Sequence, residues 1–81
     1  MKVSFTDHFE GQYGALSEKH KAKFDKQLVF LLSNLRHPSL RAKKYDKPSD
    51  IWQARVDKDY RFYFKIVGDT YVLLSIIPHP K

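Results

Sequence analysis

Two arginines and one histidine in the C-terminal part of the chain have side chains suited to holding phosphate. Arg55 and Arg61 lie in two consecutive predicted strands, and His79 follows a third. Because side chains alternate between the faces of a strand, this pattern predicts one cluster on the sheet face opposite the apolar one. Two guanidinium groups and an imidazole on an uncovered face suit a phosphate ligand, and RNA is the first substrate to consider.

Composition supports a small basic protein. The chain has 81 residues, a formal net charge of +6, a pI near 9.7 and no cysteine. We expect a single domain over residues 1–81, stabilised by packing, without disulfides, without a structural zinc site and with no cofactor. The excess positive charge favours polyanions. No apolar run approaches a membrane span or a secretory signal, so a cytoplasmic protein with no membrane partner is expected.

A strand and two helices are predicted to come first. Residues 2–6 alternate as a strand, Thr6 offers an N-cap for a first helix, and Ser17 begins a second, stronger one. The second helix is expected to stop at His37-Pro38, since the residue before proline avoids the α region. Its apolar stripe is Phe24, Leu28, Leu31, Leu32 and Leu35. The lysines between these positions are interpreted as a solvated helix face.

Three strands are predicted to complete the chain. They span residues 51–57, 60–67 and 70–78, and Lys58-Asp59 and Gly68-Asp69 supply turn signals between them. The polar, cation-rich connection over residues 38–50 is expected to be a loop or a lip over the site. The order β-α-α-β-β-β predicts an α+β fold, with two N-terminal helices packed on one face of a small twisted antiparallel sheet.

Pairing between the first two of these strands can be predicted residue by residue. Burying the aromatic side chains under the helices, with a three-residue loop, pairs Trp52 with Phe64, Ala54 with Phe62 and Arg55 with Arg61. Like charges directly opposite one another destabilise a sheet by about 0.5 kcal/mol. A sequence that keeps such a pair is interpreted as holding it for an anion.

The last strand is apolar on both sides, which makes its register harder to predict. One assignment places Val72, Leu74 and Ile76 in the core and leaves Leu73, Ser75, Ile77 and His79 on the face of Arg61. A two-residue turn at Gly68-Asp69 would reverse this, because a slip of one residue exchanges the two faces.

The same residues could instead have only structural roles. The two arginines could form salt bridges with Asp57 or Asp59, and His79 could belong to a frayed chain end. Aromatic residues that could serve as ordinary core, strand or loop residues are Trp52, Tyr45, Tyr60 and Tyr63.

The stretch from Trp52 to His79 resembles the C-terminal half of the RelE/ParE superfamily of toxins from toxin–antitoxin systems. The pattern is W-x-x-R-V-x-x-x-Y-R-x-x-F, then a turn, a hydrophobic strand and a near-terminal histidine. The closest branch is YoeB-like, judged by the spacing from Arg61 to His79. The resemblance implies a ribosome-dependent endoribonuclease that cuts mRNA in the 30S decoding site. It also implies a cognate antitoxin as partner, and operator DNA reached only through the antitoxin complex.

Metal-free RNA cleavage needs a base for the 2′-hydroxyl, cations for the phosphorane and an acid for the 5′-oxygen. Under the resemblance, His79 is the acid, Arg61 braces the phosphate and Arg55 assists it. The expected RNA-binding residues are Lys43, Lys44, Tyr45, Lys47 and Lys81.

The chain departs from the pattern at two positions. A glutamate that such enzymes carry in the loop has no counterpart, because Ala42 or a lysine occupies that region. Pro80 replaces the aromatic residue that follows the histidine in the YoeB-like branch. The general base is therefore unassigned, with Asp46, Asp50 or a lysine as candidates.

Three other functions are open on these grounds. A ParE-like protein would inhibit DNA gyrase and cut no RNA, although His79 with paired arginines argues against it. A degenerate toxin would bind its antitoxin without catalysis, and a basic domain would have no catalytic role.

Overall fold

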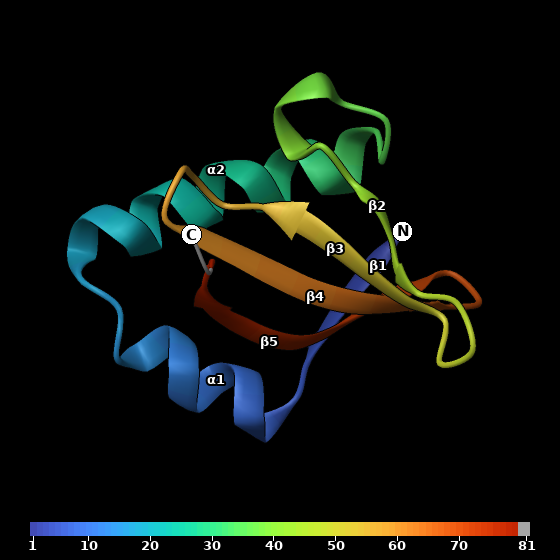
Figure 1. The fold of residues 1–81 in the computed structure, drawn as a ribbon, viewed down its shortest axis with the longest axis horizontal. Helices are drawn as coiled ribbons and strands as arrows, with labels where there is room; N and C mark the ends of the chain where they lie inside the picture. The colour runs from blue at the N-terminus through green and yellow to red at the C-terminus, as the bar shows by residue number, and fades with distance from the viewer. Residues whose placement is uncertain (80–81) are drawn as a thin grey trace.

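The structure is a computed structural model that describes residues 1–79, and its elements follow the predicted order with one strand and one short 3-10 helix added (Figure 1). They are β1 (Lys2–Phe5), α1 (Asp7–Gly14), α2 (Glu18–Ser33), a short 3-10 helix η1 (Pro38–Leu40), β2 (Lys43–Asp46), β3 (Ile51–Arg55), β4 (Tyr60–Val67) and β5 (Thr70–Pro78). The strands form one sheet in the order β1-β5-β4-β3-β2.

Both helices begin at the predicted caps. The Thr6 hydroxyl accepts a hydrogen bond from the backbone N–H of Phe9 at 3.0 Å, and the Ser17 hydroxyl accepts one from His20 at 3.3 Å. Each cap satisfies an N–H group that the first helical turn leaves without a partner. The second helix ends at Ser33, earlier than the predicted stop at His37-Pro38.

The two helices cover one face of the sheet, as predicted (Figure 1). Phe24 of α2 connects the layers, because its ring lies 5.3 Å from that of Phe9 on α1 and 5.2 Å from that of Phe62 on β4, between centroids. All three side chains are at most 2% exposed. The apolar alternation of β4 therefore packs directly against the helical layer.

The predicted pairing of β3 with β4 is confirmed. Trp52 pairs with Phe64, Ala54 with Phe62, and Arg55 with Arg61. β3 ends at Arg55, two residues before the predicted end of this strand, and the chain then turns back toward Tyr60.

The predicted faces of β5 are correct only in its second half. A two-residue turn joins Val67 to Thr70 around Gly68, whose φ of 60° is a conformation that glycine adopts easily. This turn reverses the first half, so Tyr71 and Leu73 are buried where Val72 and Leu74 were expected.

A bulge restores the predicted alternation further along β5. Tyr63 pairs with Ser75 and Phe64 with Leu73, which leaves Leu74 as an extra residue on β5. Beyond it, Ile76 is buried as predicted, and Ser75 and Ile77 line the uncovered face. His79, directly after this strand, therefore lies on the same sheet face as Arg61, as predicted.

The sheet and the connection before β3 differ from the expectation in two details. The sheet is mixed, not purely antiparallel, because β1 pairs in parallel with β5. A long helical connection follows β1, so no tight hairpin forces this strand into antiparallel pairing. The connection 38–50 is also not only a loop, since it contains η1 and the edge strand β2, paired antiparallel to β3.

No helix within residues 1–79 is long and apolar enough to cross a membrane.

Candidate functional site

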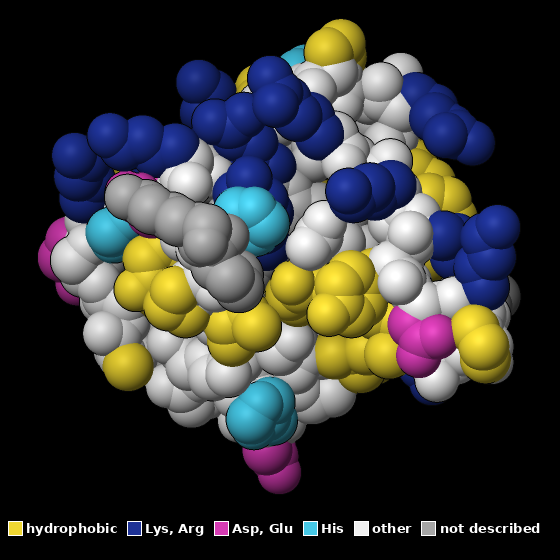
Figure 2. Space-filling model, viewed as in Figure 1, with side chains coloured by type: hydrophobic (Ala, Val, Ile, Leu, Met, Phe, Trp, Pro, Cys, Tyr) yellow, Lys and Arg dark blue, Asp and Glu magenta, His cyan; other side chains and the backbone are white. Residues whose placement is uncertain are grey.

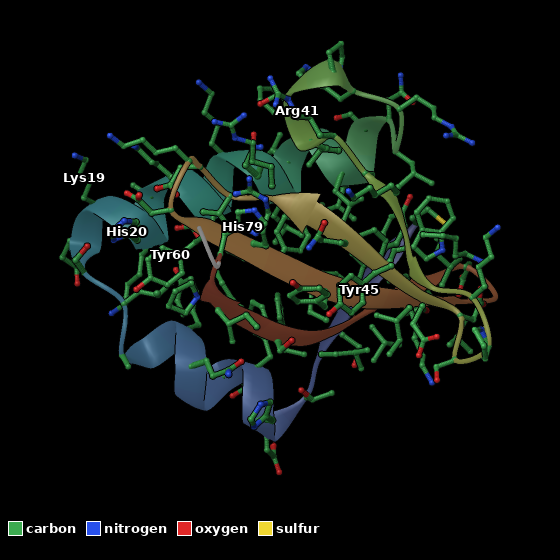
Figure 3. The ribbon with its side chains drawn as sticks, in the orientation of Figure 1. Lys19, His20, Arg41, Tyr45, Tyr60 and His79 are labelled. Atoms are coloured by element: carbon green, nitrogen blue, oxygen red, sulfur yellow. The ribbon has the colours of Figure 1, made fainter. Side chains whose placement is uncertain are left out.

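The predicted phosphate-binding residues line one pocket of about 200 Å³ on the sheet face that the helices leave uncovered. Its described lining is Arg41, Lys43, Gln53, Ala54, Arg55, Arg61 and His79. Lys and Arg side chains gather in this region around a histidine in Figure 2, and Figure 3 labels Arg41 and His79. None of these lining residues is acidic, so the pocket suits an anionic ligand.

Backbone carbonyl groups hold Arg61 in place. Its Nη1 donates to the carbonyl oxygens of Asp57 at 2.6 Å and Tyr60 at 2.9 Å. Within the described residues, no carboxylate forms a salt bridge with Arg55 or Arg61, because the Asp57 carboxylate faces His20 and Lys23. The other guanidinium N–H groups of Arg61 remain available for phosphate oxygens.

Burial lowers the pKa of Arg61, and the guanidinium groups of Arg55 and Arg41 lower it further. The like charges therefore oppose one another in the free protein, as the pairing of Arg55 with Arg61 predicts. A bound phosphate would relieve this repulsion, so the arrangement favours an anion over an apolar ligand.

His79 lies directly after β5, at the open end of the β4–β5 hairpin. Its backbone N–H donates to the carbonyl oxygen of Asp59 at 2.8 Å, which anchors the chain beyond β5. Its side chain is exposed and lines the same pocket as both arginines. The histidine is thus tied to the sheet at its backbone, not frayed.

The RNA-binding residues expected on the connection 38–50 do not all lie at the pocket. Lys43 lines the pocket, whereas Lys44 lies on the other face of β2, pairs with Asp50 and places its Nζ 5.2 Å from the ring centroid of Trp52. Lys47 is exposed in the turn after β2 and does not line the pocket. Lys81 lies outside the described residues.

Tyr45 is positioned beside an aromatic surface on the uncovered sheet face. Its side chain is 61% exposed, and its ring meets Tyr63 edge-on with centroids 4.9 Å apart. Tyr63 is buried, and its hydroxyl accepts a hydrogen bond from Gln53 at 2.9 Å. With Ile77 these rings line a mainly apolar hollow on the same face as the basic pocket.

Sequence reasoning missed Arg41 and Gln27. Arg41 follows η1 with a left-handed φ of 46°, which brings it to the pocket from a segment expected to be irregular. Buried Gln27 on α2 donates from Nε2 to the carbonyl oxygens of Ser39 at 3.0 Å and Arg55 at 2.7 Å. A polar residue interrupting the apolar face of α2 was the available signal.

Replacing Gln27 by leucine is expected to lower the free energy of unfolding by about 2–3 kcal/mol, because the partly buried carbonyl groups of Ser39 and Arg55 lose their donor. Urea denaturation would measure this loss. Lys19→Gln, at an exposed position of the same helix, should change stability by less than about 0.5 kcal/mol. Equal stability of Gln27→Leu and the wild type would show that these hydrogen bonds contribute little.

Comparisons with known proteins show the fold. No protein-family model matches the sequence, and no curated protein matches it. A YoeB/ParE toxin from Agrobacterium tumefaciens superposes with a TM-score of 0.82 at 13% identity, covering 99% of this chain and 100% of that one. RelE in the archaeal RelE–RelB complex from Pyrococcus horikoshii OT3 gives 0.79 at 17% identity, covering 95% and 92%. The isolated E. coli RelE toxin gives 0.77 at 16% identity, covering 99% and 85%.

These likenesses define the class of fold. The chain has the α+β fold of the RelE and YoeB toxins over nearly its whole length, as the sequence pattern predicted.

Proposed function

We propose that this protein is the toxin of a toxin–antitoxin system and acts as a ribosome-dependent mRNA endoribonuclease. The observation that carries the proposal is the convergence of Arg55, Arg61 and His79 on one pocket of the uncovered sheet face. The fold shared with RelE and YoeB toxins supports it. Exposed cations without an opposing carboxylate in the described pocket suit the backbone of RNA.

In the proposed reaction, a general base takes the proton of the 2′-hydroxyl, its oxygen attacks the adjacent phosphorus, and the bond to the 5′-oxygen breaks. Arg61, held by two carbonyl groups, braces the phosphate, and Arg55 on the neighbouring strand adds a second positive charge. His79 donates a proton to the leaving 5′-oxygen. Arg41 and Lys43 hold flanking phosphates.

The general base has no carboxylate candidate among the described lining residues. Asp50 pairs with Lys44 on the other side of β2, and Asp46 does not line the pocket. Lys43 is the only one of the lysine candidates for the base that lies among the described lining residues.

Mapping mRNA 5′ ends on translating ribosomes tests the activity. The wild-type chain should produce new ends near the start of reading frames, and His79→Ala should not. Intact mRNA together with inhibited DNA supercoiling would favour the ParE-like function. Intact mRNA and normal supercoiling, with an antitoxin still bound, would favour a degenerate toxin.

The proposed partner is a cognate antitoxin. Solved structures that share this fold include RelE–RelB and RelBE complexes. A chain with a net charge of +6 and a basic uncovered face suits an acidic, partly disordered partner that folds on binding. Purification from the native operon should recover a small acidic protein, and its absence would contradict the partner proposal. Operator DNA would be bound only through this complex.

Replacing Tyr45 by alanine is expected to weaken the binding of ribosome-bound mRNA by about 1 kcal/mol, roughly fivefold, because stacking of a base on the exposed ring is lost. Cleavage rates measured over a range of programmed-ribosome concentrations should show a higher KM with little change in kcat. Tyr45→Phe keeps the ring and should behave like the wild type. An unchanged KM in Tyr45→Ala would remove Tyr45 from the proposed RNA surface.

A further inference from the structure

A second group of polar side chains lies where the β3–β4 loop meets the first turn of α2. His20, Asp57 and Asp59 each offer one ligand atom, and these atoms lie within 4.8 Å of one another. His20 Nε2 lies 3.5 Å from Asp57 Oδ2. Figure 3 shows His20 at the beginning of α2, near Tyr60. These groups come from two elements that the fold holds together.

One carboxylate oxygen of Asp57 faces this group and takes part in no hydrogen bond. Its side chain is only 8% exposed, and Oδ1 accepts the backbone N–H groups of Asp59 at 2.7 Å and Tyr60 at 2.9 Å. Oδ2 is buried and accepts no hydrogen bond. A buried carboxylate oxygen without a donor is costly unless a cation compensates it.

The Asp57 carboxylate is fixed by its own loop, because the two backbone N–H groups that bind Oδ1 belong to Asp59 and Tyr60.

Two contacts orient the His20 ring so that its Nε2 faces Asp57. Nδ1 lies 2.9 Å from the Ser17 hydroxyl, and the ring packs on Tyr60 with centroids 4.6 Å apart. When Nδ1–H donates to Ser17, the lone pair of the neutral imidazole is on Nε2, which faces Asp57. Metal-binding histidines are commonly fixed by such a hydrogen bond from the second ring nitrogen.

We propose that His20, Asp57 and Asp59 bind one divalent transition-metal cation, with Zn²⁺ as the probe that matches the ligand set. One imidazole nitrogen and two carboxylate oxygens leave a fourth position for water. Zn–N and Zn–O bonds of about 2.0–2.2 Å place neighbouring ligand atoms about 3.5 Å apart, close to the distance between His20 and Asp57. The imidazole disfavours Mg²⁺ and Ca²⁺, which prefer oxygen ligands.

Lys23 competes with the metal ion in this arrangement. Its Nζ lies 3.7 Å from Asp57 Oδ2, and its side chain is 44% exposed. A flexible, partly exposed ammonium group can move into solvent when a divalent ion takes its place. Removing this ammonium group should therefore strengthen metal binding, whereas a site that is only an ion-pair network would bind no metal in either form.

The same loop supports the basic pocket. The carbonyl oxygen of Asp57 accepts from Arg61, and that of Asp59 accepts from the backbone of His79. An ion on the two carboxylates would stiffen the segment that holds both residues. An effect on RNA cleavage rests on the proposed function, but binding of the ion does not.

Isothermal titration of the untagged chain with ZnCl₂, without RNA, tests the inference. The wild type should bind one ion saturably, and MgCl₂ should give no binding. His20→Gln and Asp59→Asn should each weaken Zn²⁺ binding by more than about tenfold. Lys23→Met should tighten it, and His8→Gln, at an exposed histidine outside the cluster, should not change it.

Thermal unfolding supplies a second readout of the same variants. Zn²⁺ should raise the Tm of the wild type, since the ion binds only the folded cluster, and should not raise that of a folded Asp59→Asn chain. The inference is overturned if the wild type binds no Zn²⁺ saturably, or if both His20→Gln and Asp59→Asn retain wild-type affinity. A chain that binds zinc but cleaves no mRNA would contradict the proposed function alone.

Discussion

Replacing Arg61 by methionine is expected to slow cleavage of ribosome-bound mRNA by about 10²–10³-fold, the effect of losing one preorganised donor to a developing anion. The carbonyl groups of Asp57 and Tyr60 hold this guanidinium before the substrate arrives, so it stabilises charge without reorganising. Arg61→Lys should recover only part of the rate, because an ammonium group lacks the planar fork that binds two oxygen atoms.

Single-turnover cleavage of mRNA on programmed ribosomes measures this effect. Arg36→Met is the matched control, because Arg36 is exposed after α2 and is not among the residues that line the pocket. Circular dichroism would verify that both variants fold. Equal cleavage rates for folded Arg61→Met and Arg36→Met would contradict the role of Arg61.

Replacing Phe62 by alanine is expected to lower the free energy of unfolding by about 3–5 kcal/mol. Phe62 is fully buried at the centre of the sheet, and its ring contacts Phe24 on α2 and Phe64 on its own strand. A small domain has about 5–15 kcal/mol in total, so this change should leave the chain marginally folded.

Urea denaturation followed by Trp52 fluorescence would measure the loss. Val67→Ala is the control on the same strand, since Val67 is 59% exposed, and should cost about 0.5 kcal/mol or less. A loss below about 1 kcal/mol in Phe62→Ala would mean that the helices do not depend on this side chain.

Local patterns predicted the elements that carry the site. Thr6 and Ser17 mark both helix starts because N-cap chemistry is local. The alternation of Trp52 and Phe64 defines the pairing of β3 with β4, and the position of Arg55 across from Arg61 follows from it. These predictions needed only the period of a strand and one turn.

Predictions failed where a distant partner or a backbone irregularity decides the structure. β5 is apolar on both sides, so its residues could not reveal that the turn at Gly68 reverses its first half and that the bulge at Leu74 restores the second. Likewise, β1 takes its parallel partner from the other end of the chain.

The cationic connection was the least predictable part of the site. Pairing of β2 with β3 brings Lys43 to the pocket and turns Lys44 toward Trp52, and this separation requires knowledge of the strand. Arg41 lines the pocket from a left-handed position directly after η1, which strand or helix periodicity does not predict. The position of Arg55 across from Arg61, by contrast, followed from alternation along β3 and β4, whereas His79 lies on the predicted face because the bulge at Leu74 restores the alternation of β5.

The most direct test of the proposed chemistry is cleavage of a ribosome-bound mRNA that carries a sulfur atom in place of the 5′-oxygen at the mapped cut. A thiolate leaves without a proton, so a general acid becomes unnecessary while bracing of the phosphate remains necessary. We expect this substrate to restore most of the rate of His79→Ala and little of the rate of Arg61→Met. If His79→Ala stays as impaired as it is with the natural mRNA, His79 is not the acid and the proposed site is wrong.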